Sequence, residues 1–422
     1  PVISFKGLDN RRFYHLEPGD LRVYRDYTGC GNTVNCNVPS VTAFLMDGLE
    51  YWAREMRVDG FRFDLASVLV RDTDGFPRRD AVLPRHIELS PVLDRTRLIA
   101  EPWDAGGLYQ VGDFPGTRWA EWNGRYRDVL RRFVRGEPGI IAEVATRLTG
   151  SSDFYAPEGR RPTASVNFIT CHDGFTLRDL VSYDVKHNEA NGDGDRDGSD
   201  ENLSWNCGVE GETRDPRIAR LRRRQAKNFL ALLFLSQGVP MLRSGDEVFG
   251  TQQGNNNAYC QDNELSWFDW RATEASRDML RFVTALIAFR RRHPSLMRSD
   301  FLSGSPDGGR FPDVTWHGRR LGRQSGALAL RGLGGRSLSR LGSGFGRGLG
   351  RRFGGCSLRG FSRLARGALL LLALAARFGE LGFLLADGLS LRARLLLAAQ
   401  QVELLCAGTG RLLDGRRIVA LD

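Results

Sequence analysis

The stretch Gly60-Phe61-Arg62-Phe63-Asp64 is the part of the sequence that most strongly indicates the fold. Its alternation predicts a strand with Arg62 and Asp64 on one face and the two phenylalanines on the other, because successive strand side chains point to opposite faces. Short apolar runs of the same kind, all read as strands, occupy residues 58–65, 97–102, 119–122, 165–171 and 239–242. Helical patterns at 39–56 and 218–235 lie between these runs, and this alternation predicts βα units on a parallel sheet.

The number of predicted strands limits which architectures are possible. Five strands are visible, whereas a closed (β/α)₈ barrel requires eight. We therefore expect either an open sheet or three further βα units before residue 1.

The last hundred residues differ in composition from the rest. Residues 321–422 contain no Pro, Trp, Tyr, His, Asn, Met or Lys, and they are rich in Leu, Arg, Gly, Ala and Ser. A folded β domain needs turn residues between β-branched and aromatic strands. Either a genuine low-complexity extension or a shifted reading frame of a GC-rich gene produces such a tail, and the composition favours the frameshift. The apolar run 367–376 is about half the length of a membrane span.

The positive charge lies in the tail. The chain carries a formal net charge of +10, but residues 321–422 have 16 Arg and five acids, so residues 1–320 have a net charge of −1. We therefore expect neither a nucleic-acid partner nor a membrane partner for the globular part. Binding of nucleic acid through the Arg-rich tail is the alternative, and it predicts steep salt dependence.

Three carboxylates end or follow predicted strands. Arg62 beside Asp64 suits a nucleophilic carboxylate, since a cation favours its charged form, although a buried ion pair is an alternative. Glu101 ends the strand 97–102 beside Trp103, and an apolar neighbour raises a carboxyl pKa as an acid requires. Asp173 follows the strand 165–171 in a His-Asp-Gly sequence, which is also typical of a turn.

The spacing of the first two carboxylates makes them neighbours. Asp64 and Glu101 are about one βα unit apart, and the carboxyl ends of parallel strands hold the active sites of such sheets. Two carboxylates with opposed roles are the minimum for hydrolysis of a glycoside.

Seven segments resemble the α-amylase superfamily of glycoside hydrolases, and within it the bacterial glycogen-debranching and isoamylase branch. They are GFRFDLA, LIAEPWDAGGLYQVG, AEWN, TCHDGFTLRDLV, HNEANGDGDRDG, SQGVPMLRSGDE and GNNNAYCQDNELSWFDW. The resemblance covers residues 5–320. It implies a (β/α)₈ TIM-type barrel, truncated here to about its last five βα units and followed by the low-complexity tail. The expected domains are a partial catalytic barrel (1–300), the start of a C-terminal β domain (301–320) and the tail (321–422).

The resemblance also implies roles for individual residues. Asp64 is the nucleophile, Glu101 the acid/base and Asp173 the third carboxylate, and the implied function is retaining cleavage of α-1,6 branch linkages in glycogen or a related α-glucan. The residues implied in substrate binding are Arg62, His172, Trp103, Asp104, Asn256, Asn257 and Tyr259. Two alternatives stay open: another superfamily specificity, α-1,4 or trehalose-releasing, and a fragment without activity.

No metal or other cofactor is expected. Asp193-x-Asp195-x-Asp197-Gly198 imitates a calcium loop, but Ser204 stands where the bidentate Glu belongs. His187, His293 and His317 have no second ligand at metal spacing. The seven cysteines are widely spread and read as reduced cytoplasmic thiols.

Overall fold

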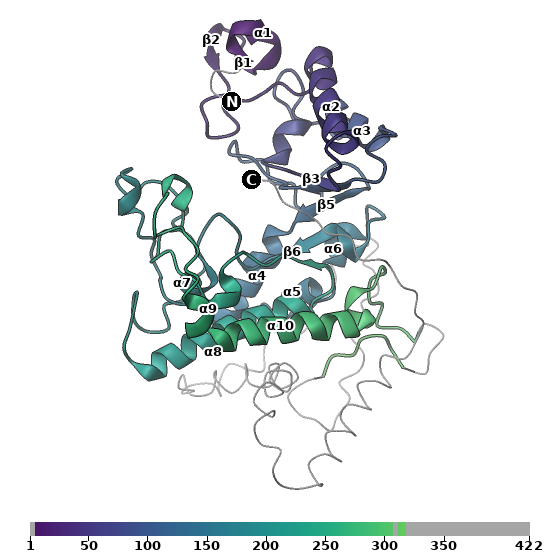
Figure 1. Ribbon diagram of the computed structural model, residues 1–422. Helices are drawn as coiled ribbons and strands as arrows, with labels where there is room; N and C mark the ends of the chain where they lie inside the picture. Colours follow the sequence, from purple (N-terminus) through teal and green to yellow (C-terminus); the bar gives the residue numbers. More distant parts are fainter. Residues whose placement is uncertain (1–4, 307–310, 318–422) are drawn as a thin grey trace, which may run out of the picture. The chain divides into compact units, whose positions relative to one another are not determined.

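The computed structural model describes residues 5–306 and 311–317 (Figure 1). Residues up to Phe301 belong to one compact unit, and residues 302–306 and 311–317 belong to a second. The predicted tail, with Cys356 and Cys406, lies outside the described residues. The five described cysteines, Cys30, Cys36, Cys171, Cys207 and Cys260, are free thiols.

A five-stranded parallel sheet is the centre of the first unit. Its strand order follows the chain, β3-β4-β5-β6-β7, and every neighbouring pair is parallel. The strands are β3 (Gly60–Phe63), β4 (Arg97–Ala100), β5 (Trp119–Trp122), β6 (Ser165–Asn167) and β7 (Val239–Pro240). All five predicted strands are confirmed. The last two are shorter than expected, although one hydrogen bond continues past Pro240, from the Met241 N–H to Asn167 O at 2.8 Å.

The described sheet is open. Strands β3 and β7 form its two edges in residues 5–306 and 311–317, and no eight-stranded barrel closes within them. The open sheet is thus the arrangement found in the described residues.

The predicted helices begin where capping signals stand. Helix α2 (Pro39–Arg54) has Pro at its first turn, and α8 (Pro216–Leu235) starts after Asp215, whose side chain accepts the Arg217 N–H at 2.7 Å. The other α-helices are α1 (Lys6–Phe13), α3 (Val82–Leu89), α4 (Gly124–Arg135), α5 (Ile141–Leu148), α6 (Ser152–Tyr155), α7 (Leu177–Leu180), α9 (Ala272–Ala275) and α10 (Arg277–Arg292). Short 3₁₀ turns occupy Ala66–Val70, Pro162–Ala164, Glu189–Asn191, Asp246–Val248, Ala258–Cys260 and Pro294–Met297.

Two long helices lie side by side below the sheet in Figure 1. Helices α8 and α10 pack against each other, and Asp278 of α10 forms ion pairs with Arg223 at 2.6 Å and with Lys227 at 3.0 Å. None of the helices in residues 5–306 and 311–317 combines the length and apolar character needed to cross a bilayer.

The first described residues form a small antiparallel element that the sequence did not predict. Strands β1 (Leu16–Glu17) and β2 (Asp20–Tyr24) follow α1 as a hairpin. Strand β1 has only two residues, and Leu21 and Val23, which alternate with polar residues in the five-residue β2, are both exposed, so the hairpin lacks the buried face that strand prediction assumes.

An apolar cluster lies beneath the carboxyl ends of the central strands. Its buried members are Trp122, Val166, Phe168 and Cys171, with Ile99, Trp103, Ala120 and Met241 packed against them. This packing fixes the strand ends from which the candidate site residues project.

Candidate active site

Asp64 directly follows β3 and is held by Arg62. Arg62 Nη1 donates a hydrogen bond to Asp64 Oδ1 at 2.7 Å. The Asp64 side chain is 70 % exposed, so this is not the buried ion pair that the sequence left as an alternative. The carboxylate is oriented by a cation and open to a ligand.

Glu101 directly follows β4 and has the opposite environment. Its side chain is only 4 % exposed, and its Oε2 accepts the Leu65 N–H at 2.8 Å. Burial raises the pKa of Glu101 to about 7, and the nearby Asp64 carboxylate adds to the rise, whereas Arg62 and the Leu65 N–H lower it. A carboxyl group with a pKa near neutrality can both donate and accept a proton.

The two carboxylates contact one guanidinium group. Strands β3 and β4 are adjacent, with Phe63 opposite Ala100, as the sequence predicted for neighbouring carboxylates. Arg62 Nη2 lies 3.0 Å from Glu101 Oε2. Because Nη2 has no hydrogen bond of acceptable geometry, this contact is an ion pair by distance only. Arg62 thus links an exposed carboxylate to a buried one.

His172 and Asp173 follow β6 after a short irregular stretch. His172 Nε2 lies 3.6 Å from Asp173 Oδ1, and the Asp173 side chain is 68 % exposed. The turn that Asp-Gly indicated is present, since Gly174 has φ +82° and its N–H donates to Asn256 O at 2.9 Å. The turn and the functional interpretation are compatible, because the turn leaves the Asp173 carboxylate open.

Trp122 joins these groups, and sequence reasoning assigned it no role. The Arg62 guanidinium lies 4.4 Å from the centre of the Trp122 ring. On the same indole, the His172 ring packs edge-on, with ring centroids 5.7 Å apart. Trp122 therefore connects the end of β3 to the residues after β6. Its place in the AEWN segment is the only sequence signal that marked it.

The other residues of AEWN hold the scaffold. Glu121 is fully buried and pairs with Arg160. Asn123 caps α4 by accepting the Tyr126 N–H at 2.8 Å, and it also donates to Ser165 Oγ at 2.9 Å. These contacts fix the end of β5 against β6.

We expected Asp104 to contact substrate, but the structure places it in a buried ion pair. Its side chain is completely buried, and both Nε and Nη2 of Arg71 lie 2.7 Å from its Oδ2. It also accepts the Leu108 N–H at 3.1 Å. Both oxygens are therefore occupied, and the structure favours a role in holding the loop after β4. Trp103, by contrast, is half-buried and stacks on Tyr109 with centroids 5.9 Å apart.

Asp104→Ala should destabilise the fold by about 3–5 kcal/mol, because it leaves the Arg71 charge buried without its partner. The matched control is Asp113→Ala, whose ion pair with Arg79 is exposed and should contribute about 1 kcal/mol or less. Denaturant unfolding of the full chain measures both. Equal losses from the two variants would contradict the structural role of Asp104.

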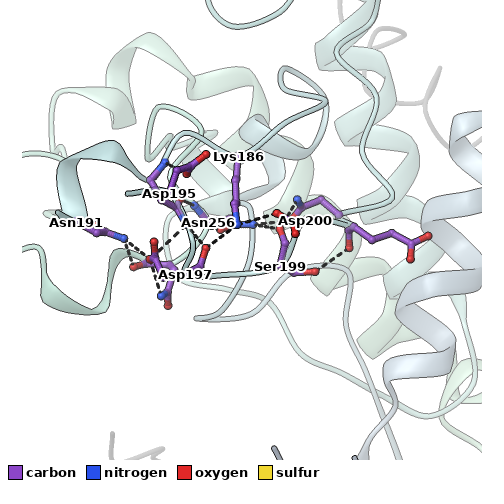
Figure 2. Close-up of polar contacts among 11 residues, drawn as sticks. Lys186, Asn191, Asp195, Asp197, Ser199, Asp200 and Asn256 are labelled. Atoms are coloured by element: carbon purple, nitrogen blue, oxygen red, sulfur yellow. Dashed lines mark hydrogen bonds and ion pairs between the residues drawn. The ribbon is translucent and has the colours of Figure 1, made fainter. Parts of the chain in front are cut away.

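Asn256 is also buried, contrary to the expectation that it faces substrate. Figure 2 shows it inside a network of amides and carboxylates. It exchanges two hydrogen bonds of 2.9 Å with Asn188, and its Nδ2 donates to Ser199 O at 2.8 Å and to Asn202 Oδ1 at 2.9 Å. With every polar group used, Asn256 supports the loop and leaves nothing for a sugar.

Of the neighbouring residues, Asn257 is hydrogen-bonded within the loop, whereas Tyr259 is exposed. Asn257 Nδ2 donates to Asp197 Oδ2 at 2.9 Å, and the same oxygen accepts from Asn191 Nδ2 at 2.7 Å (Figure 2). Tyr259 is 76 % exposed, so its ring is free to meet a ligand.

The calcium-like segment takes part in this network. The Asp197 carboxylate accepts amide hydrogens, and Asp195 Oδ1 accepts the Asn188 N–H at 2.9 Å. Within residues 5–306 and 311–317, no group of three or more His, Cys, Asp or Glu side chains is arranged to hold a metal ion.

Comparison with known sequences finds close relatives over three quarters of the chain. It is 52 % identical over 319 residues to "Glycogen operon protein GlgX homolog" of Mycobacterium tuberculosis, which covers 75 % of the chain and 44 % of the relative. It is 50 % identical over 318 residues to "Isoamylase 3, chloroplastic" of Oryza sativa subsp. japonica, and this match covers 75 % of the chain and 40 % of the relative. It is 50 % identical over 297 residues to "Glycogen debranching enzyme" of Serratia proteamaculans, and this match covers 70 % of the chain and 44 % of the relative. The chain thus spans less than half the length of these relatives.

Known structures agree on the fold. The pullulanase from Bacillus acidopullulyticus superposes with a TM-score of 0.55 at 24 % identity, over 70 % of this chain and 33 % of that one. The pullulanase from Anoxybacillus sp. LM18-11 complexed with maltotetraose superposes with a TM-score of 0.52 at 26 % identity, over 70 % of this chain and 39 % of that one. No family model matches the sequence.

The relatives at 50–52 % identity place the chain in the α-amylase superfamily, and the parallel sheet with carboxylates at adjacent strand ends agrees with this assignment. Within it, the chain belongs to the glycogen-debranching and isoamylase branch.

Proposed function

We propose that this chain is a retaining glycoside hydrolase that cleaves α-1,6 branch linkages in glycogen or a related α-glucan. The observation that carries the proposal is the pair formed by Asp64 and Glu101, one exposed and one buried, on a single guanidinium group. The names of the relatives support debranching as the activity. Because the chain spans less than half of those relatives, its own turnover is part of the proposal.

The two environments suit two roles. Asp64 attacks the anomeric carbon while Glu101 donates its proton to the glycosidic oxygen, so the C–O bond breaks and a glycosyl ester forms on Asp64. Glu101, now a carboxylate, takes a proton from water as the water oxygen attacks the anomeric carbon on the face opposite Asp64, and the bond between that carbon and Asp64 breaks to release the carboxylate. Two inversions give net retention of the anomeric configuration.

The remaining residues orient the sugar. His172 and the exposed carboxylate of Asp173 bind hydroxyl groups of the ring on which positive charge develops, and Asp173 stabilises that charge. Trp103, Asn257 and Tyr259 are the remaining substrate contacts in the proposal, whereas Asp104 and Asn256 act through the loops that they hold. No cofactor takes part, and the expected cytoplasmic location stays a prediction.

Proton NMR of the full chain acting on a branched α-glucan tests the function. The α-1,6 anomeric signal should disappear, and the first product should be the α-anomer. Loss of α-1,4 signals alone, or release of trehalose, would establish another superfamily specificity. A folded chain that leaves every linkage intact would overturn the proposal.

The pH dependence of kcat/KM should report Glu101. This acid works only when protonated, and its pKa is about 7, so activity on branched glucan should fall as pH rises through that value. The Glu101→Gln variant, assayed with an activated leaving group, should lack this alkaline limb. An unchanged limb in the variant would assign the titration to another group.

Trp122→Leu should lower kcat about tenfold, since a cation–π contact with Arg62 is worth about 0.5–2 kcal/mol. Trp122→Phe keeps a ring beneath the guanidinium and should recover part of the loss. KM should change less than kcat in both variants, because Trp122 acts through Arg62 and His172. Equal kcat in the Leu and Phe variants would contradict this positioning role.

A further inference from the structure

A surface groove lies apart from the three candidate catalytic carboxylates. It has a volume of about 320 Å³ and is lined in part by Arg135, Asp184, Asp200, Glu201, Ser204 and Trp205. Asp64, Glu101 and Asp173 are not among its lining residues. This volume is at the lower end of the roughly 300–1,000 Å³ that is typical of small-molecule sites.

One wall of the groove is fixed by the network drawn in Figure 2. Lys186 Nζ lies 2.7 Å from Asp200 Oδ1 and donates to Asp197 O at 2.9 Å. Further along the same wall, Asn202 Oδ1 accepts from Asn256 Nδ2 at 2.9 Å. A wall already held by hydrogen bonds reduces the ordering cost of binding a ligand.

Trp205 is the aromatic residue among those that line the groove. Trp205 is partly exposed, and its backbone N–H donates to Leu180 O at 3.1 Å, which anchors the residue to the end of α7. An indole presents a flat apolar face with a polar edge. Such a face matches the C–H side of a pyranose ring.

The polar lining supplies both donors and acceptors. The exposed Arg135 guanidinium, whose Nη2 lies 3.7 Å from Glu137 Oε2, has further N–H groups that can donate, while the exposed Glu201 carboxylate can accept. Sugar hydroxyls do both, so a neutral polyol fits this mixed set better than an ion of either sign.

A cation fits the groove less well, although three acids line it. The Asp200 carboxylate is paired with Lys186, and Asp184 Oδ1 already accepts the Asn206 N–H at 2.8 Å. No metal-binding cluster of three such side chains occurs in the described part of the chain.

We propose that this groove is a second carbohydrate-binding site that takes a segment of α-1,4-linked glucan. The lining indicates carbohydrate, and the choice of α-glucan rests on the proposed function. A chain held here is anchored to the same loop that supports Asn256, whose carbonyl accepts the Gly174 N–H beside Asp173. The site therefore holds a long branched substrate while the catalytic carboxylates act elsewhere on it.

Fluorine NMR of the full chain labelled with 5-fluorotryptophan tests the proposal, with maltohexaose as the probe. The resonance missing from Trp205→Phe identifies Trp205. This resonance should shift saturably with maltohexaose and stay unmoved by calcium chloride. No shift with maltohexaose, or a shift with calcium alone, would overturn the proposal.

Two variants test whether Glu201 contacts the bound maltohexaose. Glu201→Gln should weaken maltohexaose binding about threefold through loss of a charge-assisted hydrogen bond. The matched control Glu264→Gln changes an exposed acid outside the groove and should leave the affinity unchanged. Equal effects from the two variants would contradict a contact at Glu201.

Asp173→Ala separates this site from the catalytic one. The Trp205 titration should survive in that variant, whereas its loss would show that the signal came from binding at the catalytic carboxylates. A Trp205 titration in a chain that cleaves no α-1,6 bond would leave the groove established and the proposed function refuted.

Discussion

Replacing Asp64 with Asn should lower turnover of branched glucan by roughly 10⁴-fold or more, because the amide cannot form the glycosyl ester. The loss should be equally severe with an activated leaving group, since the step removed is the attack on the anomeric carbon. Added azide should give no rescue, because no intermediate exists for it to attack. Initial rates with both substrates, with and without azide, measure this.

The control for this variant is Asp113→Asn, which changes an exposed aspartate outside the proposed machinery. It should keep full activity, and the two variants should unfold at similar temperatures, because the Asp64 side chain is largely exposed. Recovery of the Asp64→Asn activity by azide would contradict its assignment as nucleophile.

Replacing Glu101 with Gln should lower turnover of branched glucan about 10²–10⁴-fold, the range expected for loss of general acid catalysis. Here the leaving group decides the outcome. A glycosyl fluoride needs little protonation, so the first step should survive on it and the glycosyl ester should accumulate. Azide should then restore turnover, because an anionic nucleophile needs no general base.

Glu101→Gln is also a clean structural change. The side chain is buried and accepts the Leu65 N–H, and a glutamine oxygen can keep that hydrogen bond. A variant equally impaired on both kinds of leaving group, with no response to azide, would contradict the acid/base assignment.

The sequence was sufficient to predict the five strands of the parallel sheet and the neighbouring carboxylates. Alternation around Arg62 placed Asp64 at a strand end, and the interval of one βα unit placed Glu101 on the next strand, as the register of β3 and β4 shows. Both signals are local, because strand periodicity and crossover length depend on nearby residues.

Contacts between distant segments could not be predicted in this way. Asp104 and Arg71 are far apart in the sequence, so nothing local showed that the carboxylate is buried in an ion pair. Asn256 likewise meets partners from residues 188–202. The motif marked both residues as important, but only the fold shows that they hold loops.

Trp122 was missed for a related reason. A tryptophan at the end of an apolar strand indicates core packing, and it does pack in the core. Its contacts with Arg62 and His172 arise because three strand ends converge.

The measurement that tests the central claim most directly is peptide mass spectrometry of the Glu101→Gln chain after reaction with an α-maltosyl fluoride. In this variant the first step proceeds and the second stalls, so one glycosyl group should be found on the peptide that contains Asp64 and fragmentation should place it on that residue. An adduct on any other carboxylate, or no adduct from a folded chain, would contradict the account.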